Sequence, residues 1–314
     1  MTELGLGLQT DKPPGSYAPL ARAAEGAGFA VVTAFNDLWF QPALPALLEV
    51  AHATSRVRVG ASCWNPFTVH PVELAGQAAV LDAVAGGRSF VGLARGSWLE
   101  EVGLDVSRPV AAVREAWEVI RRLLAGDESG FEGSRFSLQR GARLRYEVAR
   151  RSVQLLVGTW SPRLAAFAGE AARELKVGGS ANPDVVAVLR EWIANDLVGI
   201  VFGAVTVVDE DGARARAAAR REVAMYLEVV GGLDPTFDVD PELLARVRED
   251  PDLIPDDVLD RFAFAGTPAA VVEQAEALFQ AGAARVDFGT PHGIDERRGV
   301  ELLCREVAPR FDSK

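Results

Sequence analysis

The chain has 314 residues, of which 33 are Lys or Arg and 44 are Asp or Glu, so its formal net charge is −11. This acidic balance, with no basic run, excludes a surface built to neutralise nucleic-acid phosphates or an anionic membrane. Hydrophobic residues make up 49% of the chain, which is enough for a large core and is typical of a folded globular protein.

Along the chain, eight short apolar runs alternate with longer segments of helical period. The expected strands are Leu4–Gln9, Phe29–Phe35, Val57–Cys63, Ser89–Ala94, Val153–Gly158, Leu175–Gly178, Val198–Val207 and Arg285–Gly289. The expected helices cover residues 16–28, 42–54, 70–86, 108–126, 161–172, 183–195, 210–229, 267–282 and 296–310.

This alternation predicts an α/β fold. Strands separated by helices of this length pair in parallel through right-handed crossovers, and eight such units close into a (β/α)₈ TIM barrel. A doubly wound open sheet is the competing fold, but the segment TDKPPGSY after Gln9 lacks the GxGxxG that it would carry there. We therefore expect a single barrel domain over residues 1–314.

Two segments break the alternation, namely residues 127–151, after the fourth strand region, and residues 231–264, before the last helix–strand unit. The first is mixed and polar, and the second is rich in acidic residues and proline. We expect both to be insertions on the barrel rather than separate domains. Because barrel loops build the active site, either could be a lid, and a solvated acidic loop is the alternative for the second.

The two cysteines, Cys63 and Cys304, lie far apart and form neither a CxxC motif nor a disulfide framework. This usage favours a reducing compartment and implies no metal site. The N-terminal residues do not have the pattern of a signal peptide, and no apolar run approaches the ~20 residues that span a membrane. We expect a cytoplasmic protein that binds neither nucleic acid nor membrane.

In a barrel, the residues that follow each strand meet at one mouth. This set is rich in glycine, small polar residues and tryptophan, and it is poor in His, Lys and metal ligands. A hydrolase would need a nucleophile–base pair or a metal cluster, so the composition favours a cofactor that carries the reaction. The residues are Gln9, Asn36 and Asp37, Ser62 to Asn65, Arg95 to Trp98, Gly158 to Ser161, Gly178 to Asn182, and Gly289 to Gly293.

Two of these turns suit a phosphate. In VGTWSPRL, Gly158 precedes Ser161 and Arg163 at a helix start, where free N–H groups, a hydroxyl and a guanidinium come together. The segment KVGGSANPD repeats the arrangement with residues 178–182. Ordinary helix capping is the competing explanation for each turn.

Four segments together resemble the bacterial luciferase-like monooxygenase superfamily and, within it, the branch that uses the deazaflavin coenzyme F420, typified by methylenetetrahydromethanopterin reductase. They are residues 60–88 (GASCWNPFTVHPVELAGQAAVLDAVAGGR), 91–110, 155–184 and 265–293. The resemblance implies a (β/α)₈ oxidoreductase that moves a hydride at C5 of the deazaflavin, acts on a small molecule and forms a homodimer.

The resemblance also implies roles for particular residues. A non-prolyl cis peptide, at Ser62–Cys63 here, would back the deazaflavin ring. The residues flanking the ring would be Asn65, Arg95, Gly96 and Ser97. The phosphate region would be held by Gly158, Ser161, Gly178, Gly179, Ser180 and Asn182, and His292 would close the last strand.

The sequence departs from the family pattern at the ends of three predicted strands. Asn36 and Asp37 stand where many relatives have Asp-His, Ser97 stands where relatives often have a carboxylate, and Gln9 replaces a glutamate. The acceptor is therefore expected to be smaller or less polar than a pterin.

A hydride delivered to a C=C or C=N bond requires a proton donor for the other atom. Asp37 is the first candidate, because a carboxyl group beside Trp39 and Phe40 would be desolvated; the alternative is that it caps a turn. Gln9 and Asn36 complete the candidate catalytic set. Glu100 and Glu101 are other possible donors, although an acidic pair in a helix is usually a solvated face.

Among the histidines, His292 in GTPHG is the best functional candidate, whereas His52 and His70 are explained by packing or capping. The tryptophans Trp64, Trp98 and Trp160 follow strand ends, which favours walls of a ring-binding site. Two alternatives to the deazaflavin enzyme stay open, an FMN-dependent monooxygenase of the same fold and a non-catalytic cofactor-binding barrel.

Overall fold

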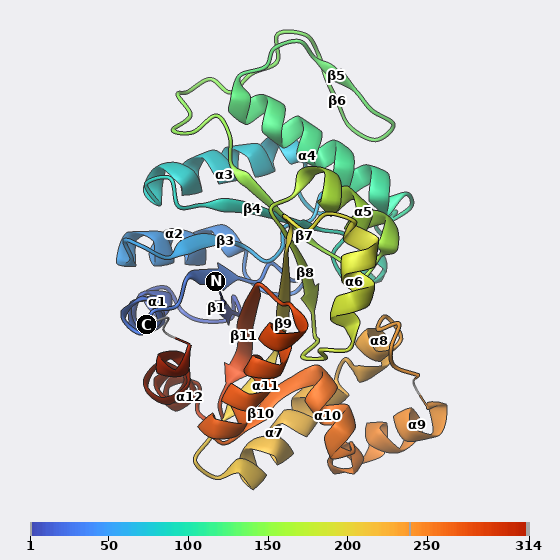
Figure 1. Ribbon diagram of the computed structural model, residues 1–314. Helices are drawn as coiled ribbons and strands as arrows, with labels where there is room; N and C mark the ends of the chain where they lie inside the picture. Colours follow the sequence, from blue (N-terminus) through green and yellow to red (C-terminus); the bar gives the residue numbers. More distant parts are fainter. Residues whose placement is uncertain (1, 239, 312–314) are drawn as a thin grey trace. The chain divides into compact units, whose positions relative to one another are not determined.

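The structure is a computed structural model and describes residues 2–238 and 240–311. Strands and helices alternate along the chain (Figure 1). Two compact units are present: unit 1 contains Met1–Gly7, Arg22–Val31 and Lys176–Lys314, and unit 2 contains Leu8–Ala21 and Val32–Leu175. The unit boundaries fall inside β1 (Glu3–Leu8), α1 (Tyr17–Gly26), β2 (Val31–Ala34) and β8 (Glu174–Gly178).

In unit 2, parallel strands are followed by helices. Its other elements are β3 (Arg58–Ala61), α2 (Ala43–Ala53), α3 (Pro71–Val84), β4 (Phe90–Ala94), a 3-10 turn (Leu99–Val102), α4 (Pro109–Ala125), β7 (Gln154–Gly158) and α5 (Pro162–Ala171). Strand β4 pairs in parallel with β7, from Phe90 opposite Gln154 to Ala94 opposite Gly158. Strand β3 neighbours β2, and isolated parallel bridges join Val59 to Ser89 and Trp64 to Leu93.

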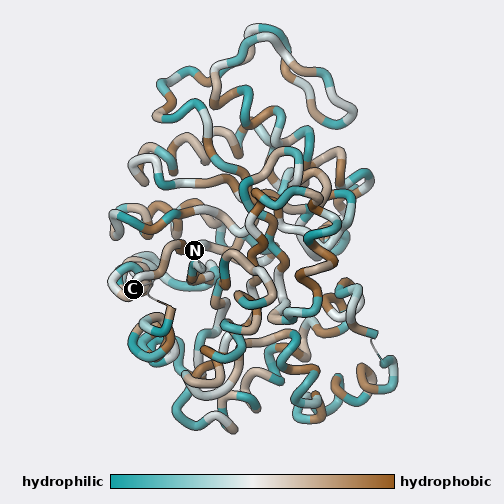
Figure 2. The backbone as a smooth tube through the Cα atoms, viewed as in Figure 1, coloured by the Kyte–Doolittle hydropathy of each residue, from teal (hydrophilic) through white to brown (hydrophobic). Residues whose placement is uncertain are grey.

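Helix α4 shows why the helical segments form where the period predicts them. Its buried residues Ala112, Ala116, Val119 and Leu123 recur at the spacing of one helix face. The strands, by contrast, are apolar on successive residues, as in a parallel sheet covered on both sides. Figure 2 shows hydrophobic residues concentrated along the strands, whereas the outer segment that contains β5 and β6 is mixed.

Unit 1 contains parallel strands in the order β1, β11, β9 and β8, with β11 (Arg285–His292) between β1 and β9 (Gly199–Val208). Its helices are α6 (Val185–Ile193), α7 (Gly212–Ala224), α8 (Leu227–Gly231), α9 (Pro241–Glu249), α10 (Asp256–Phe262), α11 (Pro268–Ala281) and α12 (Glu296–Leu302). A π-helical turn (Leu303–Val307) and a 3-10 turn (Ala308–Arg310) follow. Within the described residues, no helix has both the length and the apolar composition that crossing a membrane requires.

All eight predicted strands are confirmed, with ends shifted by a few residues, and so are the nine predicted helices. The helix expected over 210–229 is broken into α7 and α8. One parallel strand was missed: β10 (Ala263–Gly266) follows α10 directly and pairs with the second half of β9, from Ala263 opposite Val205. Four residues without a flanking turn are too short to show a period.

The two irregular segments differ in structure. Residues 127–151 carry a short antiparallel hairpin, β5 (Phe131–Glu132) with β6 (Ser137–Leu138). The solvated-loop interpretation of 231–264 is wrong for residues 241–262, which form α9, a 3-10 turn (Pro251–Leu253) and α10; residue 239 lies outside the described residues. Acidic and proline residues cap these elements, and their apolar residues pack against α7: Leu243, Val247, Ile254, Val258, Leu259 and Phe262.

Candidate active site

Unit 2 joins the ends of its strands through backbone hydrogen bonds. The N–H of Ser62 donates to the carbonyl of Ala34, and the N–H of Trp64 donates to that of Gly92, each across 2.9 Å. The N–H of Ala94 returns a bond to the carbonyl of Trp64, also across 2.9 Å. The segments after β2, β3 and β4 therefore lie side by side, as the carboxyl ends of neighbouring parallel strands do.

The Ser62–Cys63 peptide bond is cis, as the resemblance implied. Two glycines leave room for the segment around this bond, Gly158 for the Cys63 side chain and Gly92 for the backbone before it. A Cβ on Gly158 would lie 2.8 Å from Cys63 Sγ, and one on Gly92 would lie 2.0 Å from the carbonyl oxygen of Ala61. A side chain at either position would therefore force a neighbouring atom to move, and Cys63, Gly92, Ala94 and Gly158 form what we call the small-residue wall.

Asn65 is buried beside this wall, and its amide oxygen is fully engaged. Oδ1 accepts hydrogen bonds from the N–H of Phe67 (3.1 Å), the N–H of Thr68 (2.9 Å) and the Thr68 hydroxyl (3.0 Å). The Nδ2 group faces Gly96, where a Cβ would lie 3.1 Å from it, and it donates to no group in the described part of the chain. Asn65 thus keeps an oriented donor available to a ligand.

The segment after β4 is more exposed. Arg95 forms an ion pair with Glu100, with side chains 41% and 57% exposed, and Ser97 is at the surface. Gly96 has φ +89°, a left-handed conformation that favours glycine. The guanidinium of Arg95 is therefore neutralised by its own loop.

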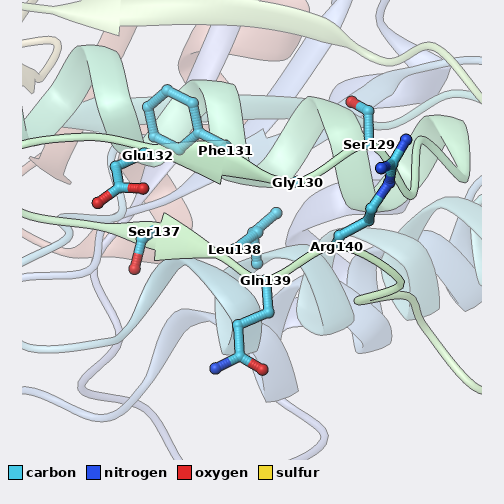
Figure 3. A pocket seen from close by; sticks show the side chains of 8 residues that line it. All are labelled: Ser129, Gly130, Phe131, Glu132, Ser137, Leu138, Gln139 and Arg140. Atoms are coloured by element: carbon cyan, nitrogen blue, oxygen red, sulfur yellow. The ribbon is translucent and has the colours of Figure 1, made fainter.

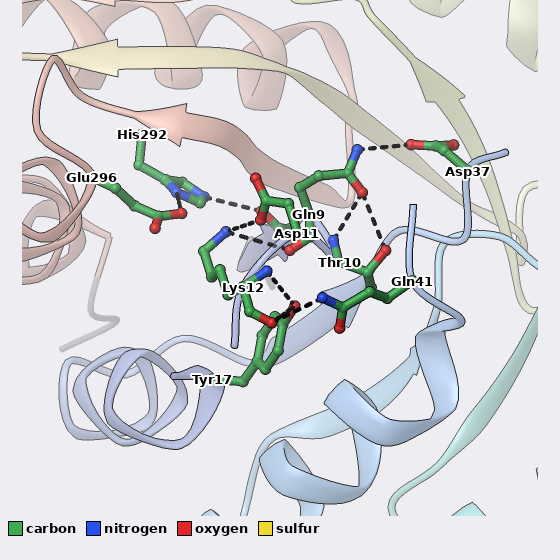
Figure 4. A network of polar contacts seen from close by, with 10 residues as sticks. Gln9, Thr10, Asp11, Lys12, Tyr17, Asp37, Gln41, His292 and Glu296 are labelled. Atoms are coloured by element: carbon green, nitrogen blue, oxygen red, sulfur yellow. Dashed lines mark hydrogen bonds and ion pairs between the residues drawn. The ribbon is translucent and has the colours of Figure 1, made fainter. Parts of the chain in front are cut away.

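A carboxyl–amide pair occupies the ends of β1 and β2 in unit 2 (Figure 4). Gln9 Nε2 donates to Asp37 Oδ2 across 3.0 Å, and Gln9 Oε1 accepts the Thr10 N–H across 2.8 Å. The second bond sets the orientation of the Gln9 amide, because only its nitrogen can then point to the carboxylate. Asp37 is partly buried. Because the Gln9 amide is held in one orientation, Asp37 Oδ2 has a fixed hydrogen-bond donor.

Asn36, the third candidate catalytic residue, has a structural role. Its Oδ1 accepts the N–H of Ala43 across 3.0 Å, at the first residue of α2. This bond satisfies one of the donors that a helix start leaves open.

The first predicted phosphate turn opens α5. The N–H of Ser161 donates to the Thr159 hydroxyl across 2.9 Å, and the Ser161 side chain does not cap the helix. Pro162 has no N–H, and the N–H groups of Arg163 and Leu164 have no acceptor among the residues that the structure describes. These donors, with the exposed Arg163 side chain, are suited to an anion.

The second turn, in unit 1, has its backbone donors engaged by protein. The N–H groups of Gly179 and Ser180 donate to the Gly203 carbonyl (2.6 and 3.2 Å), and that of Ala181 donates to Arg261 (2.8 Å). Gly178 is exposed, and a Cβ there would meet no atom within 4 Å. Gly178 therefore borders open space, whereas Ser180 to Asn182 are buried.

Asn182 ties this turn to the segment after α8. Its Nδ2 donates to Asp234 Oδ2 (2.8 Å) and to the Thr236 hydroxyl (2.9 Å), and Asp234 is 3% exposed. A Cβ on Gly179 would contact Val230 at 2.9 Å. The Asn182 amide thus anchors residues 230–236 over the end of β8.

His292 is completely buried in unit 1, with φ +71° and a cis Thr290–Pro291 bond before it. Its Nε2 lies 3.0 Å from the carbonyl oxygen of Gly7 (Figure 4). The bond requires a proton on Nε2. Nδ1 lies 3.6 Å from Glu296 Oε1 and has no hydrogen-bond partner among the described residues, so the Nε2 bond is the one that joins the end of β11 to β1.

The predicted tryptophans divide into two environments. Trp64 is 1% exposed, and its indole N–H has no hydrogen-bond partner in the described chain, whereas Trp98 is 45% exposed and Trp160 is partly exposed.

Sequence reasoning missed Lys12, whose Nζ lies 3.3 Å from the Gln9 carbonyl and 2.7 Å from Asp11. Its position just after the first predicted strand could have marked Lys12 as a candidate site residue.

Sequence reasoning also missed a buried charge cluster on the strands of unit 1. Asp287 accepts from Lys176 and from Arg285, each across 2.7 Å, and all three residues are at least 94% buried. Burial raises the pKa of Asp287, but the charges of Arg285 and Lys176 outweigh it and lower the pKa to about 2. Gly5 and Gly203 leave room for these side chains.

The hairpin of unit 2 borders a hollow of about 610 Å³ (Figure 3). Its lining comes from residues 129–132 and 137–140. None of the strand-end residues described above contributes to it, so we do not take it as the active site.

Parallel strands followed by helices, with small and polar residues at the strand ends, define a protein of the (β/α)₈ class. The family model described as "Luciferase-like monooxygenase" matches residues 1–285, and the chain belongs to this family.

Individual relatives agree with this assignment. The chain is 27% identical over 293 residues to 5,10-methylenetetrahydromethanopterin reductase of Archaeoglobus fulgidus, with 84% of this chain and 86% of that protein covered. It is 27% identical over 297 residues to F420-dependent glucose-6-phosphate dehydrogenase of Rhodococcus erythropolis, covering 84% and 82%. The solved coenzyme F420-dependent tetrahydromethanopterin reductase of Methanopyrus kandleri matches with a TM-score of 0.88, 25% identity and 99% coverage of each chain. The predicted luciferase-like TIM-barrel fold class is confirmed.

Proposed function

We propose that the protein is an oxidoreductase that transfers a hydride between coenzyme F420 and a small organic substrate, reducing a C=C or C=N bond or running the reverse dehydrogenation. The observation that carries this proposal is the Gln9–Asp37 pair, an oriented carboxyl group 3.0 Å from its amide donor at the strand ends. The relatives named above that use coenzyme F420 support the cofactor.

The residues of unit 2 fit such a cofactor. The small-residue wall around Cys63 and Gly158 carries no bulky side chain that would stand in the way of a planar ring, and Asn65 supplies an oriented amide donor beside it. The open N–H groups at the start of α5 suit its phosphate, together with Ser161 and Arg163. When bound, coenzyme F420 supplies a hydride donor or acceptor at C5 of its deazaflavin.

In unit 1, Gly178 borders open space, and Gly179, Ser180 and Asn182 shape the turn that follows it. Since their donors bond to protein groups, we assign the main phosphate contact to the α5 turn. His292 would act by holding the end of β11 rather than by touching the ring.

Asp37 is the proposed proton donor or acceptor. Gln9 donates to Oδ2 and so orients the carboxyl group, whose proton would be transferred to the substrate atom next to the one that receives the hydride. Asn36 holds the start of α2 and so fixes the loop on which Asp37 lies.

The experiment is a titration of the purified protein with oxidised and reduced coenzyme F420, and with FMN in parallel, followed by turnover over a panel of enones, imines and alcohols. We expect coenzyme F420 to bind and its visible absorbance to change on turnover. Binding of FMN alone would contradict the proposal.

An FMN-dependent monooxygenase is the second candidate, because the family as a whole is described as monooxygenases. Oxygen uptake with reduced FMN would favour it, and binding of coenzyme F420 without any turnover would favour a non-catalytic barrel. Both the homodimer and the cytoplasmic location stay predictions.

A further inference from the structure

Unit 2 has a pocket of about 200 Å³ whose lining includes the three residues that follow the candidate catalytic Asp37 in the chain. It joins the loop after β2 to the loop after β4, and its lining residues are Leu38, Trp39, Phe40, Trp98 and Glu101. The N–H of Phe40 donates to the Asp37 carbonyl across 3.4 Å, so part of the pocket belongs to the same turn as Asp37.

Three aromatic rings of this pocket are exposed to solvent. Trp39 is 69% exposed, and Phe40 and Trp98 are each 45% exposed. Large aromatic side chains gain most by burial, so three adjacent exposed rings indicate a surface that a ligand covers.

The backbone holds two of these rings in an unfavourable conformation. Trp39 has φ +74° and Trp98 has φ +58°, in the left-handed region that bulky residues rarely adopt. Such conformations persist where the surrounding structure enforces them, and they concentrate at ligand-binding sites. The backbone conformation of the two loops therefore fixes the positions of Trp39 and Trp98.

The charge of the pocket selects the ligand. Glu101 is the one charged lining residue, and its carboxylate forms no ion pair within the described residues. The neighbouring cation, Arg95, is paired with Glu100. Aromatic faces and a carboxylate attract a cation, and the net charge of −11 adds to the attraction.

We propose that this pocket binds a substrate that carries one flat ring and a protonated amine. A cavity of ~150 Å³ accommodates a benzene molecule, so about 200 Å³ has room for one ring with a small substituent. The inference rests on the proposed function, since it names the substrate class of that site, and it sets this chain apart from enzymes of anionic sugar phosphates.

The experiment uses cofactor-free protein and three probes of similar shape: benzylamine, which is protonated at pH 7, benzyl alcohol and benzoate. Binding is measured by calorimetry and ligand-observed NMR. We expect benzylamine to bind about three- to fivefold more tightly than benzyl alcohol, in line with a cation–π contact at an exposed site, and benzoate to bind most weakly.

Two variants assign the preference to the pocket. Glu101→Gln should remove most of the preference for the amine and leave the affinity for benzyl alcohol unchanged, whereas Trp98→Ala should weaken both about fivefold or more. Glu132→Gln and Leu197→Ala, which change exposed residues outside the pocket, are the matched controls and should bind as the wild type does.

Equal binding of benzoate and benzylamine, no binding of any probe, or an unchanged amine preference in Glu101→Gln would each overturn the inference. Because the assay contains no cofactor, its result is independent of the proposed hydride transfer. Amine binding without coenzyme F420 binding would refute the proposed function alone, and F420-dependent turnover without the amine preference would refute this inference alone.

Discussion

Gln9 and Asp37 are joined by a hydrogen bond of 3.0 Å from Nε2 to Oδ2, although 28 residues separate them. The Thr10 N–H holds the other end of the same amide at 2.8 Å. The amide therefore cannot turn its oxygen to the carboxylate without losing a bond, and one carboxyl oxygen keeps a constant donor.

Replacing Asp37 should separate cofactor binding from catalysis. Asp37→Asn should lower the rate of hydride transfer by about 100-fold or more, because an amide cannot exchange the proton, while the dissociation constant for coenzyme F420 changes little. Single-turnover absorbance and a binding titration measure the two quantities. Gln9→Leu should lower the rate by about three- to tenfold through loss of orientation, and Gln139→Leu on the hairpin is the control. A wild-type rate in Asp37→Asn would remove Asp37 from the mechanism.

The small-residue wall should not tolerate a methyl group at Gly158. In Gly158→Ala, the new Cβ would lie 2.8 Å from Cys63 Sγ, so we expect a loss of about 1–3 kcal/mol in unfolding free energy and weaker binding of coenzyme F420. Urea unfolding and titration measure both effects. Adding Cys63→Ala should restore part of the loss.

The matched control is Gly26→Ala, where a Cβ meets no atom within 4 Å. Since Gly26 ends a helix, this variant should be neutral or stabilising by about 0.5–1 kcal/mol. Equal effects of the two substitutions would show that the wall is not tightly packed.

The buried carboxylate of Asp287 should give unfolding a specific pH dependence. Its pKa is about 2 in the folded protein and about 3.9 in an unfolded chain. The folded value is depressed, so its contribution of about 2 kcal/mol is fully present above pH ~4 and is lost as the pH falls toward 2.

Asp287→Asn should abolish that component. It should also lower the unfolding free energy at pH 7 by about 3–5 kcal/mol, because Lys176 and Arg285 would lose their counter-ion in the interior. Urea unfolding of both proteins from pH 2 to 7 measures the difference. Parallel pH curves for the two proteins would contradict the assignment.

The contact between Asn182 and Asp234 should hold residues 230–236 in place. Asn182→Asp would bury two carboxylates together, so we expect a loss of about 2–4 kcal/mol in unfolding free energy at pH 7 and faster proteolysis of the segment. Asn195→Asp, at a partly exposed turn, is the control. Unchanged proteolysis of Asn182→Asp would show that the segment is held by other contacts.

Much of the fold was predictable because its signals are local. The strand Phe90–Ala94 is a short apolar run, and α4 repeats buried residues at helical spacing. The secondary structure of each segment can therefore be predicted from its own residues. Strand β10 carries no such signal, since its four residues follow α10 without a turn. Its pairing with β9 comes from the rest of unit 1.

The candidate site was predictable as a set of positions and not as a set of contacts. The order of strands and helices placed Gln9, Asp37 and Asn65 at strand ends, because parallel strands have their carboxyl ends on the same side. Their composition also indicated a cofactor rather than a hydrolytic centre.

The sequence by itself determined the alternation of elements, the family and the positions from which a site could be built. Only the tertiary structure decided the hydrogen-bond partner of each side chain. Gln9 Nε2 donates to Asp37, whereas the Asn182 amide donates to Asp234, 52 residues away. Local period encodes which face of an element is buried, but hydrogen bonds between distant segments depend on the packing of the whole unit, which no short stretch of sequence specifies.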